Sequence, residues 1–239
     1  MMSGKVYFVG AGPGDPELIT LRGNALLEDA DLVLYTGSLV SQEVLRYVKG
    51  ETINSHGLNL DELTEIMVDA VRDNKKVVRL HTGDPSLYGA IYEQIVALKE
   101  KNIESEIVPG VSSLFAAAAS LGVQLTLSGV TETLIVTRPA GETLESDTIR
   151  ELSKYHPTMA IFLGVHKIEE IMDKVEYPPE TPAAVVYHAS WQDEEIIIGT
   201  VSDIAEKVKN SGIRQSAMIL IGDVIHPESF RRSHLYGSQ

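Results

Sequence analysis

The hydrophobic pattern of the chain alternates between short runs rich in β-branched residues and longer segments with helical periodicity. Such alternation is typical of βα units, whose strands form a mainly parallel sheet. The strands predicted on this basis are 6–9, 31–35, 77–80, 104–108, 133–137, 158–163, 183–187, 195–198 and 218–221. The sequence therefore predicts an α/β fold.

The segments between these strands carry signals for helix ends. Asp15 can cap a helix whose first residue is Pro16, where the missing N–H costs nothing. Asn59 and Glu62 have the spacing of a capping box, and Gly212 stands where a C-terminal cap is expected. The predicted helices are 60–71, 90–100, 114–121, 147–154, 167–174 and 202–210.

The pattern restarts after the turn-rich stretch 122–131. A chain of 239 residues suits one large domain or two modest ones. We therefore predict an N-terminal α/β domain over 1–122 and a C-terminal α/β domain over 123–239, with mainly parallel or mixed sheets.

Composition excludes several functions. The chain has no cysteine, which removes thiol nucleophiles and thiolate metal sites. Its net charge of -14, with no Lys/Arg-rich stripe, makes nucleic acid a poor partner. No run approaches the roughly 20 apolar residues of a membrane span. Because the N-terminus enters a strand pattern without a cleavable signal, we expect a cytoplasmic protein.

The Gly-rich loop at residues 10–15 follows the first predicted strand. A dinucleotide fingerprint G-x-G-x-x-G needs glycine where this chain has Asp15, whose carboxylate would face the pyrophosphate. Pro13 also removes one N–H donor. The loop is therefore either a tight turn without a ligand or a site for a ligand that is not a phosphate.

Four ordered motifs carry a family resemblance. The segments are Val9-Gly10-Ala11-Gly12-Pro13-Gly14-Asp15-Pro16, Tyr35-Thr36-Gly37-Ser38-Leu39-Val40, His81-Thr82-Gly83-Asp84-Pro85 and Val108-Pro109-Gly110-Val111-Ser112-Ser113. In order and spacing the chain resembles the tetrapyrrole methyltransferases, over nearly its whole length. Within that family, segments 35–40 and 81–89 are most similar to the members that methylate C11 of precorrin-4 or cobalt-precorrin-4.

This resemblance implies a fold of two domains with S-adenosylmethionine in the cleft between them, a tetrapyrrole substrate and a homodimer. It also implies a set of cofactor-binding positions. They are Pro13, Thr82, Gly83, Asp84, Leu87, Ser112, Ser113, Leu163 and Ala189.

The chain departs from the family pattern at two places. Ser55-His56-Gly57 stands where the family usually has Ser-Ala-Gly. Residues 138–144 read Arg-Pro-Ala-Gly-Glu-Thr-Leu, so Glu142 replaces the second arginine of an expected Arg-Ala-Ser-Gly-Arg-Thr-Pro-like segment. The second departure bears on the substrate more than on the cofactor.

Basic side chains follow several predicted strands, where a parallel sheet exposes its ligand-binding residues. These are His81, Arg138, His166 and His188. Together they predict a basic lining for the carboxylate arms of the macrocycle, with His81, Arg138 and His166 as substrate contacts. Each histidine could instead be a satisfied structural group.

Methyl transfer from a sulfonium depends mainly on in-line positioning, because the leaving group departs neutral. We therefore predict no protein nucleophile and no protein-bound metal. Asp84 is either a helix cap or a hydrogen-bond acceptor beside the cofactor. If a base removes a proton, His56 and His188 are the candidates. The predicted catalytic residues are thus Asp84, His56 and His188.

Other functions remain open from sequence. The acceptor could be uroporphyrinogen III, another precorrin, a protein side chain or RNA, although the acidic charge argues against RNA and segment 35–40 against a protein. A nicotinamide-dependent oxidoreductase is disfavoured by Asp15. A tetrapyrrole-binding protein without catalytic activity is the last alternative.

Overall fold

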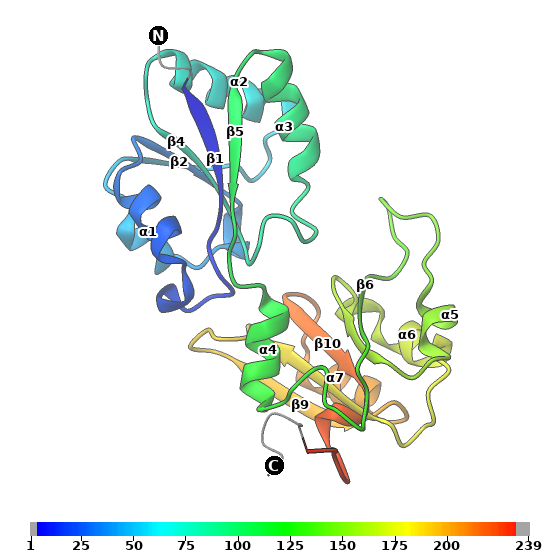
Figure 1. Ribbon diagram of the computed structural model, residues 1–239. Coiled ribbons are helices and arrows are strands. Elements are labelled where there is room, and N and C mark those ends of the chain that lie inside the picture. The colour runs from blue at the N-terminus through cyan, green and yellow to red at the C-terminus, as the bar shows by residue number, and fades with distance from the viewer. Residues whose placement is uncertain (1–3, 233–239) are drawn as a thin grey trace. The chain divides into compact units, whose positions relative to one another are not determined.

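The computed structural model describes residues 4–232 and divides into two compact units (Figure 1). The first ends at Ser113 and the second begins at Leu114, nine residues before the boundary expected from the sequence. Helix α4 (Ser113–Leu121) accounts for the difference. Its buried face packs in one cluster with Ala160 and Leu220 of the second sheet, so the helix belongs to the second unit.

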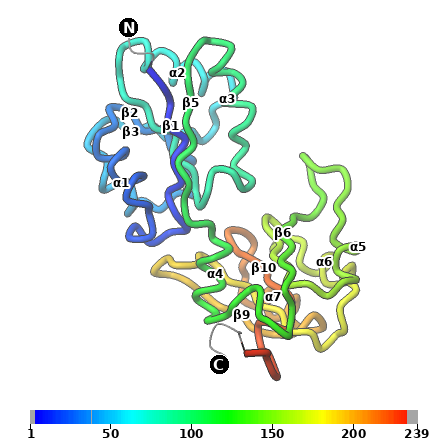
Figure 2. The backbone as a smooth tube through the Cα atoms, viewed as in Figure 1, coloured from blue at the N-terminus to red at the C-terminus, as the bar shows by residue number. Residues whose placement is uncertain are grey.

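The first unit contains a sheet of five parallel strands in the order β3-β2-β4-β1-β5. The strands are β1 (Lys5–Gly10), β2 (Leu32–Tyr35), β3 (Glu51–Asn54), β4 (Val77–His81) and β5 (Glu104–Val108). Figure 2 shows β1 and β5 side by side although they are far apart in sequence. Because all five strands are parallel, their carboxyl ends form one edge, as the α/β pattern predicts.

Helices cover both faces of this sheet. One core cluster joins Phe8 and Leu34 to α2 (Leu60–Arg72) and α3 (Ile91–Glu100). The other joins Val33 and Leu80 to α1 (Leu21–Glu28). Strand residues alternate between the two clusters, as expected for a sheet buried on both sides.

Local end signals explain where several helices begin and end. The predicted capping box at α2 is confirmed, since Asn59 Oδ1 accepts from Glu62 N at 3.0 Å and Asn59 N donates to Glu62 Oε2 at 2.9 Å. Asp15 caps a short turn that begins with Pro16. Gly212 ends α7 (Ile204–Ser211) with a φ of 81°. These three positions were predicted from the sequence.

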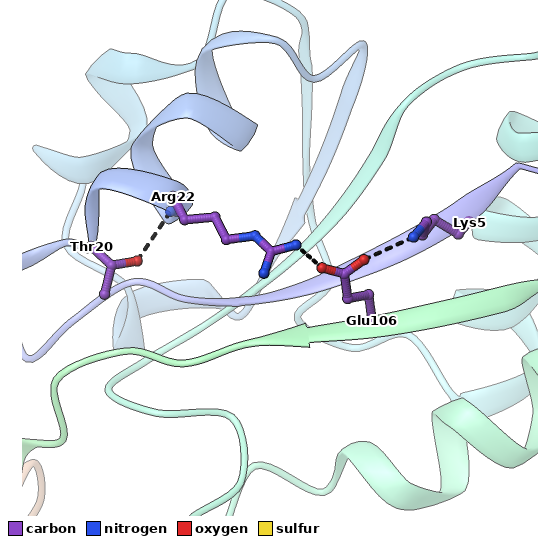
Figure 3. Close-up of polar contacts among 5 residues, drawn as sticks. Lys5, Thr20, Arg22 and Glu106 are labelled. Atoms are coloured by element: carbon purple, nitrogen blue, oxygen red, sulfur yellow. Dashed lines mark hydrogen bonds and ion pairs between the residues drawn. The ribbon is translucent and has the colours of Figure 1, made fainter.

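Helix α1 begins at Leu21, later than the helix start at Pro16 that the sequence predicts. Thr20 caps it by accepting from Gly23 N at 3.0 Å. Figure 3 shows how Arg22 of α1 and Lys5 of β1 both pair with Glu106 of β5, with Lys5 Nζ 2.8 Å from Glu106 Oε2. Lys5 and Glu106 are half-buried and Arg22 is exposed. Such surface ion pairs add little stability, so the helix is held mainly by its buried leucines.

The second unit has a mixed sheet in the order β6-β7-β10-β8-β9. The strands are β6 (Leu134–Thr137), β7 (Thr158–Ile161), β8 (Pro182–Tyr187), β9 (Glu195–Thr200) and β10 (Ala217–Ile221). Only β6 and β7 pair in parallel, and β10 runs antiparallel to both β7 and β8. The start of β10 therefore lies at the same sheet edge as the ends of β7 and β8.

Helices also cover both faces of the second sheet. Helices α5 (Ile149–Ser153), α6 (Ile168–Lys174) and α7 pack in one cluster, and α4 packs in the other. Among residues 4–232, none of the helices has the length and apolar character needed to span a membrane.

Candidate active site

Three glycines let the loops at the carboxyl edge of the first sheet touch. A Cβ on Gly10 would lie 2.6 Å from both Gly83 O and Gly110 Cα, and a Cβ on Gly110 would lie 2.2 Å from Gly83 O. The loop of β1 also pairs with that of β4, because Gly83 N donates to Gly12 O at 2.8 Å. Only glycine permits this contact of three backbones.

Asp84 fastens this arrangement. Its Oδ2 accepts from Gly110 N at 2.9 Å, and its Oδ1 accepts from Ser86 N at 2.9 Å and from the Ser86 hydroxyl. Burial raises the pKa of Asp84, but the hydrogen bonds from Ser86 and Gly110 outweigh it, so the net pKa is below its usual range. The half-buried carboxylate is therefore ionised at neutral pH and joins the loops of β4 and β5.

The predicted cofactor positions of the first unit gather around this point. Pro13 follows Gly12, which pairs with Gly83. A Cβ on Gly83 would lie 3.6 Å from Ser112 Cα and 3.7 Å from Ser113 N. Thr82 is exposed and Leu87 half-buried in the same β4 loop. The structure thus brings the sequence-predicted cofactor residues of three motifs to one sheet edge.

His81 differs from its prediction as a basic substrate contact. Only 5% of the residue is exposed, and its ring stacks on Phe8. Burial, together with the charge of Arg79, lowers the pKa of His81 to about 3. Since the imidazole is neutral and faces the interior, His81 supplies no positive charge for carboxylate arms. Its buried Nε2 has no hydrogen-bond partner among the described residues.

Arg79 is a buried cation that the sequence analysis missed. Its Nε donates to Gln94 Oε1 at 3.2 Å and its Nη1 to Leu34 O at 3.3 Å. Burial lowers the pKa of Arg79 to about 10, and within residues 4–232 no carboxylate pairs with it. Gln94 Nε2 in turn donates to the carbonyl of Ala90, whose φ is 48°. Arg79 therefore supports the strained loop that follows Asp84.

His56 lies at the same sheet edge but farther from Asp84. It follows β3, which is separated from β4 by β2. Its backbone N donates to Asn54 Oδ1 at 2.9 Å, and Gly37 N donates to the same oxygen at 3.1 Å. Its exposed side chain extends the edge toward β3.

The second unit has its own edge of strained residues. Leu163 after β7, His188 after β8 and Ser216 before β10 have φ values of 54°, 45° and 56°. The left-handed conformation costs roughly 1–2 kcal/mol for such residues and often marks a functional site. Strand β7 ends at Ile161, two residues earlier than predicted, because Leu163 is in the left-handed conformation. Leu163 is 59% exposed, whereas Ala189 is buried beside α4.

His188 is held by one carboxylate and two rings. Its Nδ1 lies 3.0 Å from both carboxylate oxygens of Asp193. Its ring stacks on Tyr187 at 3.8 Å and on Trp191 at 4.5 Å between centroids. Asp193 was not found from the sequence, because its contact depends on the left-handed turn at His188 and Ser190.

The two remaining predicted substrate contacts have different surroundings. Arg138 closes its own loop, donating to Thr143 Oγ1 at 2.9 Å and to Thr143 O at 3.2 Å. His166 is exposed in a cavity of about 170 Å³, together with Lys209 and Arg214. Arg214 was not predicted and makes no ion pair with a described residue. No group of three or more metal-ligating side chains occurs within residues 4–232.

These features define an α/β protein of two units, each with a sheet edge suited to binding a ligand. The family model of the Tetrapyrrole (Corrin/Porphyrin) Methylases matches residues 5–205. The chain belongs to this family, and the resemblance drawn from its motifs is confirmed.

Individual relatives narrow the comparison. The chain is 54% identical to the cobalt-precorrin-4 C(11)-methyltransferase of Methanocaldococcus jannaschii, across 97% of this chain and 92% of that protein. A crystal structure of a cobalt precorrin-4 methyltransferase, a cobalamin biosynthetic enzyme, superposes with a TM-score of 0.90 and 44% identity, covering 93% of this chain and 96% of that one.

A more distant structure carries a ligand. The uroporphyrin-III C-methyltransferase of Thermus thermophilus, complexed with S-adenosylhomocysteine, has a TM-score of 0.79 and 30% identity, covering 96% of this chain and 97% of that one. The predicted α/β fold class is confirmed by these structures.

Proposed function

We propose that this chain transfers a methyl group from S-adenosylmethionine to C11 of cobalt-precorrin-4 or of its metal-free counterpart. The observation that carries the proposal is the 54% identity, over nearly the whole chain, to a cobalt-precorrin-4 C(11)-methyltransferase. The cobalt ion, where present, belongs to the substrate, and the reaction is proposed to need no protein-bound metal.

The carboxyl edge of the first sheet fits such a cofactor. The absence of Cβ atoms at Gly10, Gly83 and Gly110 lets backbone approach closely, and the ionised Asp84 favours a ligand with a cationic end. When bound, S-adenosylmethionine supplies an electrophilic methyl group on a sulfonium. The proposed contacts from this unit are Pro13, Thr82, Gly83, Asp84, Leu87, Ser112 and Ser113.

In this proposal the residues of the chain act mainly by positioning. Asp84 fixes the β4 loop against Gly110, so the backbone groups of that loop are ordered before the ligand binds. Leu163 and Ala189 are further proposed cofactor contacts in the second unit. Two features of Leu163 support this role. Its side chain is exposed, and its backbone has a positive φ, a strained conformation that is frequent at ligand-binding sites.

The substrate contacts are proposed on charge. The cavity around His166 also holds Lys209 and Arg214, and its size suits one carboxylate arm. Glu169, Glu170 and Lys167 line the same cavity. Lys209 is paired with Glu169 and Lys167 donates to Ala140 O, so Arg214 is the cation proposed to meet an anionic group there. Arg138 orders the neighbouring loop and is proposed to present it to the macrocycle. His81 is not part of this set, because it is buried and neutral.

A cytoplasmic homodimer is also proposed. The family resemblance supports it, and light scattering on the purified protein measures the mass in solution. A mass of one chain, about 26 kDa, would refute the dimer.

Methylation assays test the acceptor. The purified protein is incubated with S-adenosylmethionine and, in parallel, uroporphyrinogen III, precorrin-2, precorrin-3, precorrin-4 and cobalt-precorrin-4. Mass spectrometry counts the methyl groups, and NMR with a ¹³C-labelled methyl group locates them. We expect one methyl group at C11 of a precorrin-4 form. If the protein methylates only uroporphyrinogen III or precorrin-2, the proposed acceptor is wrong and the substrate is another tetrapyrrole.

Titration calorimetry tests the cofactor separately. We expect S-adenosylmethionine to bind and NADH not to bind. If neither ligand binds, the chain is a tetrapyrrole-binding protein without this activity.

A further inference from the structure

We propose that His188 and Asp193 form the proton-accepting pair of the methyl transfer, with His188 as the base and Asp193 as its positioning residue. This inference rests on the proposed function, because it names the group that removes the proton released by the acceptor. It adds to the sequence-based choice of His56 or His188 by selecting His188 and supplying its partner.

The hydrogen bonding of His188 leaves one ring nitrogen for a substrate. In a neutral imidazole one nitrogen donates and the other accepts. Nδ1 lies 3.0 Å from both oxygens of the Asp193 carboxylate, so Nδ1 carries the proton and donates it to that group. Nε2 is then the acceptor. Among residues 4–232 it has no hydrogen-bond partner, and 19% of the side chain is exposed.

The ring is also fixed in orientation. Tyr187 and Trp191 stack on it with interplanar angles of 17° and 23°. Its backbone N donates to Ser216 O at 3.1 Å, which anchors the left-handed residue to the start of β10. A fixed ring favours catalysis by a base, because no side-chain rotamer has to be ordered when Nε2 accepts the proton.

The neighbouring carboxylate of this turn, Glu194, is already engaged. Glu194 Oε2 accepts from Ser190 N at 2.6 Å and from Ser120 Oγ at 2.7 Å, so it holds the turn against α4. Glu195 lies exposed at the start of β9. Asp193 is therefore the carboxylate directed to the imidazole.

His56 lacks such a partner. Its backbone N donates to Asn54 Oδ1, and its side chain is exposed. No carboxylate among the described residues pairs with the His56 ring. The structure thus distinguishes the two histidines that the sequence could not.

The proton balance of the reaction requires an acceptor of this kind. Carbon–carbon bond formation uses a π electron pair of the ring, and the carbon–sulfur bond breaks with its electron pair going to sulfur. The thioether leaves neutral, so the positive charge passes to the methylated ring. Loss of an N–H proton from that ring to His188 Nε2 restores its neutral, conjugated state, and His188 carries the charge opposite Asp193.

The decisive experiment is chemical rescue. His188→Ala is expected to lower kcat about 100-fold or more, the size typical of general-base catalysis, while the KM for S-adenosylmethionine changes less than about threefold. Added imidazole is expected to restore turnover. Across a series of substituted imidazoles, the rescued rate should rise with the pKa of the added base. Rescue independent of that pKa would show that the ring only fills space, and would overturn the proposal.

A second variant tests the positioning residue. Asp193→Asn keeps a side-chain oxygen near Nδ1 but removes the charge opposite the protonated ring, so kcat is expected to fall at least tenfold. In the His188→Ala background, the same substitution should cost much less, because the two residues act as one unit. Additive effects would overturn the pairing. His188→Gln, which keeps a polar side chain of similar length without a basic ring nitrogen, replaces His188→Ala if that variant does not fold.

His156 provides a matched control. It is also left-handed, with a φ of 46°, and stacks on Tyr177, but its Nε2 contacts the carbonyl of Glu176 at the other edge of the second sheet. His156→Ala should leave kcat within about threefold of wild type.

Trp191 is the single tryptophan of the sequence, so its fluorescence reports whether the stack persists in Asp193→Asn.

The outcomes separate this proposal from the proposed function. If the wild-type protein methylates no tetrapyrrole, the proposed function fails first. If wild type methylates precorrin-4 and His188→Ala matches its kcat, the function stands and the base assignment is wrong.

Discussion

The carboxylate of Asp84 accepts a hydrogen bond from the backbone N–H of Gly110 at 2.9 Å, across a separation of 26 residues. The two loops follow β4 and β5, which are not neighbours, because β1 lies between them. Gly10 at the end of β1 has no side chain, and so the two loops can meet above it. Asp84 thereby joins two loops rather than capping one helix start.

This contact predicts how substitutions affect the cofactor. Asp84→Ala removes the acceptor for Gly110 and for Ser86, and is expected to weaken S-adenosylmethionine binding at least tenfold in titration calorimetry. Ser86→Ala removes only the local hydroxyl and keeps the bond to Gly110, so its affinity should stay within about threefold of wild type. Equal losses in both variants would assign Asp84 to the local cap alone.

The buried state of His81 predicts a pH dependence of stability. The pKa of His81 falls from 6.5 in an unfolded chain to about 3 in the folded protein, through burial and the charge of Arg79. Between these values the unfolded chain binds more protons, so the free energy of unfolding decreases as the pH falls below about 6.5. Above that pH the contribution is constant. Urea unfolding between pH 5 and 8 measures this slope.

The matched variants isolate the group responsible. His81→Leu should show a shallower decrease of stability with acidification than wild type, whereas His56→Leu, at an exposed position, should keep the wild-type slope. An unchanged slope in His81→Leu would mean that other groups cause the pH dependence.

The hydrogen bond between Gln94 and Arg79 predicts a strong dependence between two substitutions. Gln94→Leu leaves the buried Nε of Arg79 without its acceptor, at a cost of about 1–3 kcal/mol in the free energy of unfolding. Arg79→Met in that background removes the buried charge as well, so much of this loss should return. Urea unfolding of the four proteins gives the coupling energy. Additive losses would contradict the pairing.

Much of the fold could be predicted because its signals are local. The capping box of Asn59 and Glu62 and the cap at Gly212 involve residues close in sequence, and the structure has both. The helix expected to start at Pro16 starts at Leu21 instead, because Asp15 caps only a short turn and Thr20 caps α1. The boundary was placed late because an Ala-rich helix does not show which sheet it packs against.

The site was predictable only in part, for a related reason. The motifs brought Pro13, Gly83 and Ser112 into one group, and the structure places them at one sheet edge. The environment of a side chain cannot be found this way. His81 and His188 both follow apolar strands. His81 is buried and stacks on Phe8, whereas His188 has a left-handed backbone and contacts Asp193.

The last prediction concerns Leu163, which combines an exposed apolar side chain with a φ of 54°. Glycine adopts this backbone without strain, although it also increases the entropy of the unfolded chain. Leu163→Gly should therefore leave the free energy of unfolding unchanged or raise it by up to about 1 kcal/mol.

If the side chain contacts the cofactor, the same variant should bind S-adenosylmethionine at least fivefold more weakly, measured by titration calorimetry alongside thermal unfolding. Leu163→Met keeps an apolar side chain of similar volume and should retain the wild-type affinity. A gain in stability without a loss of affinity would remove Leu163 from the cofactor site. A fall in stability would show instead that the strain at Leu163 is smaller than the effect of the entropy that glycine adds to the unfolded chain.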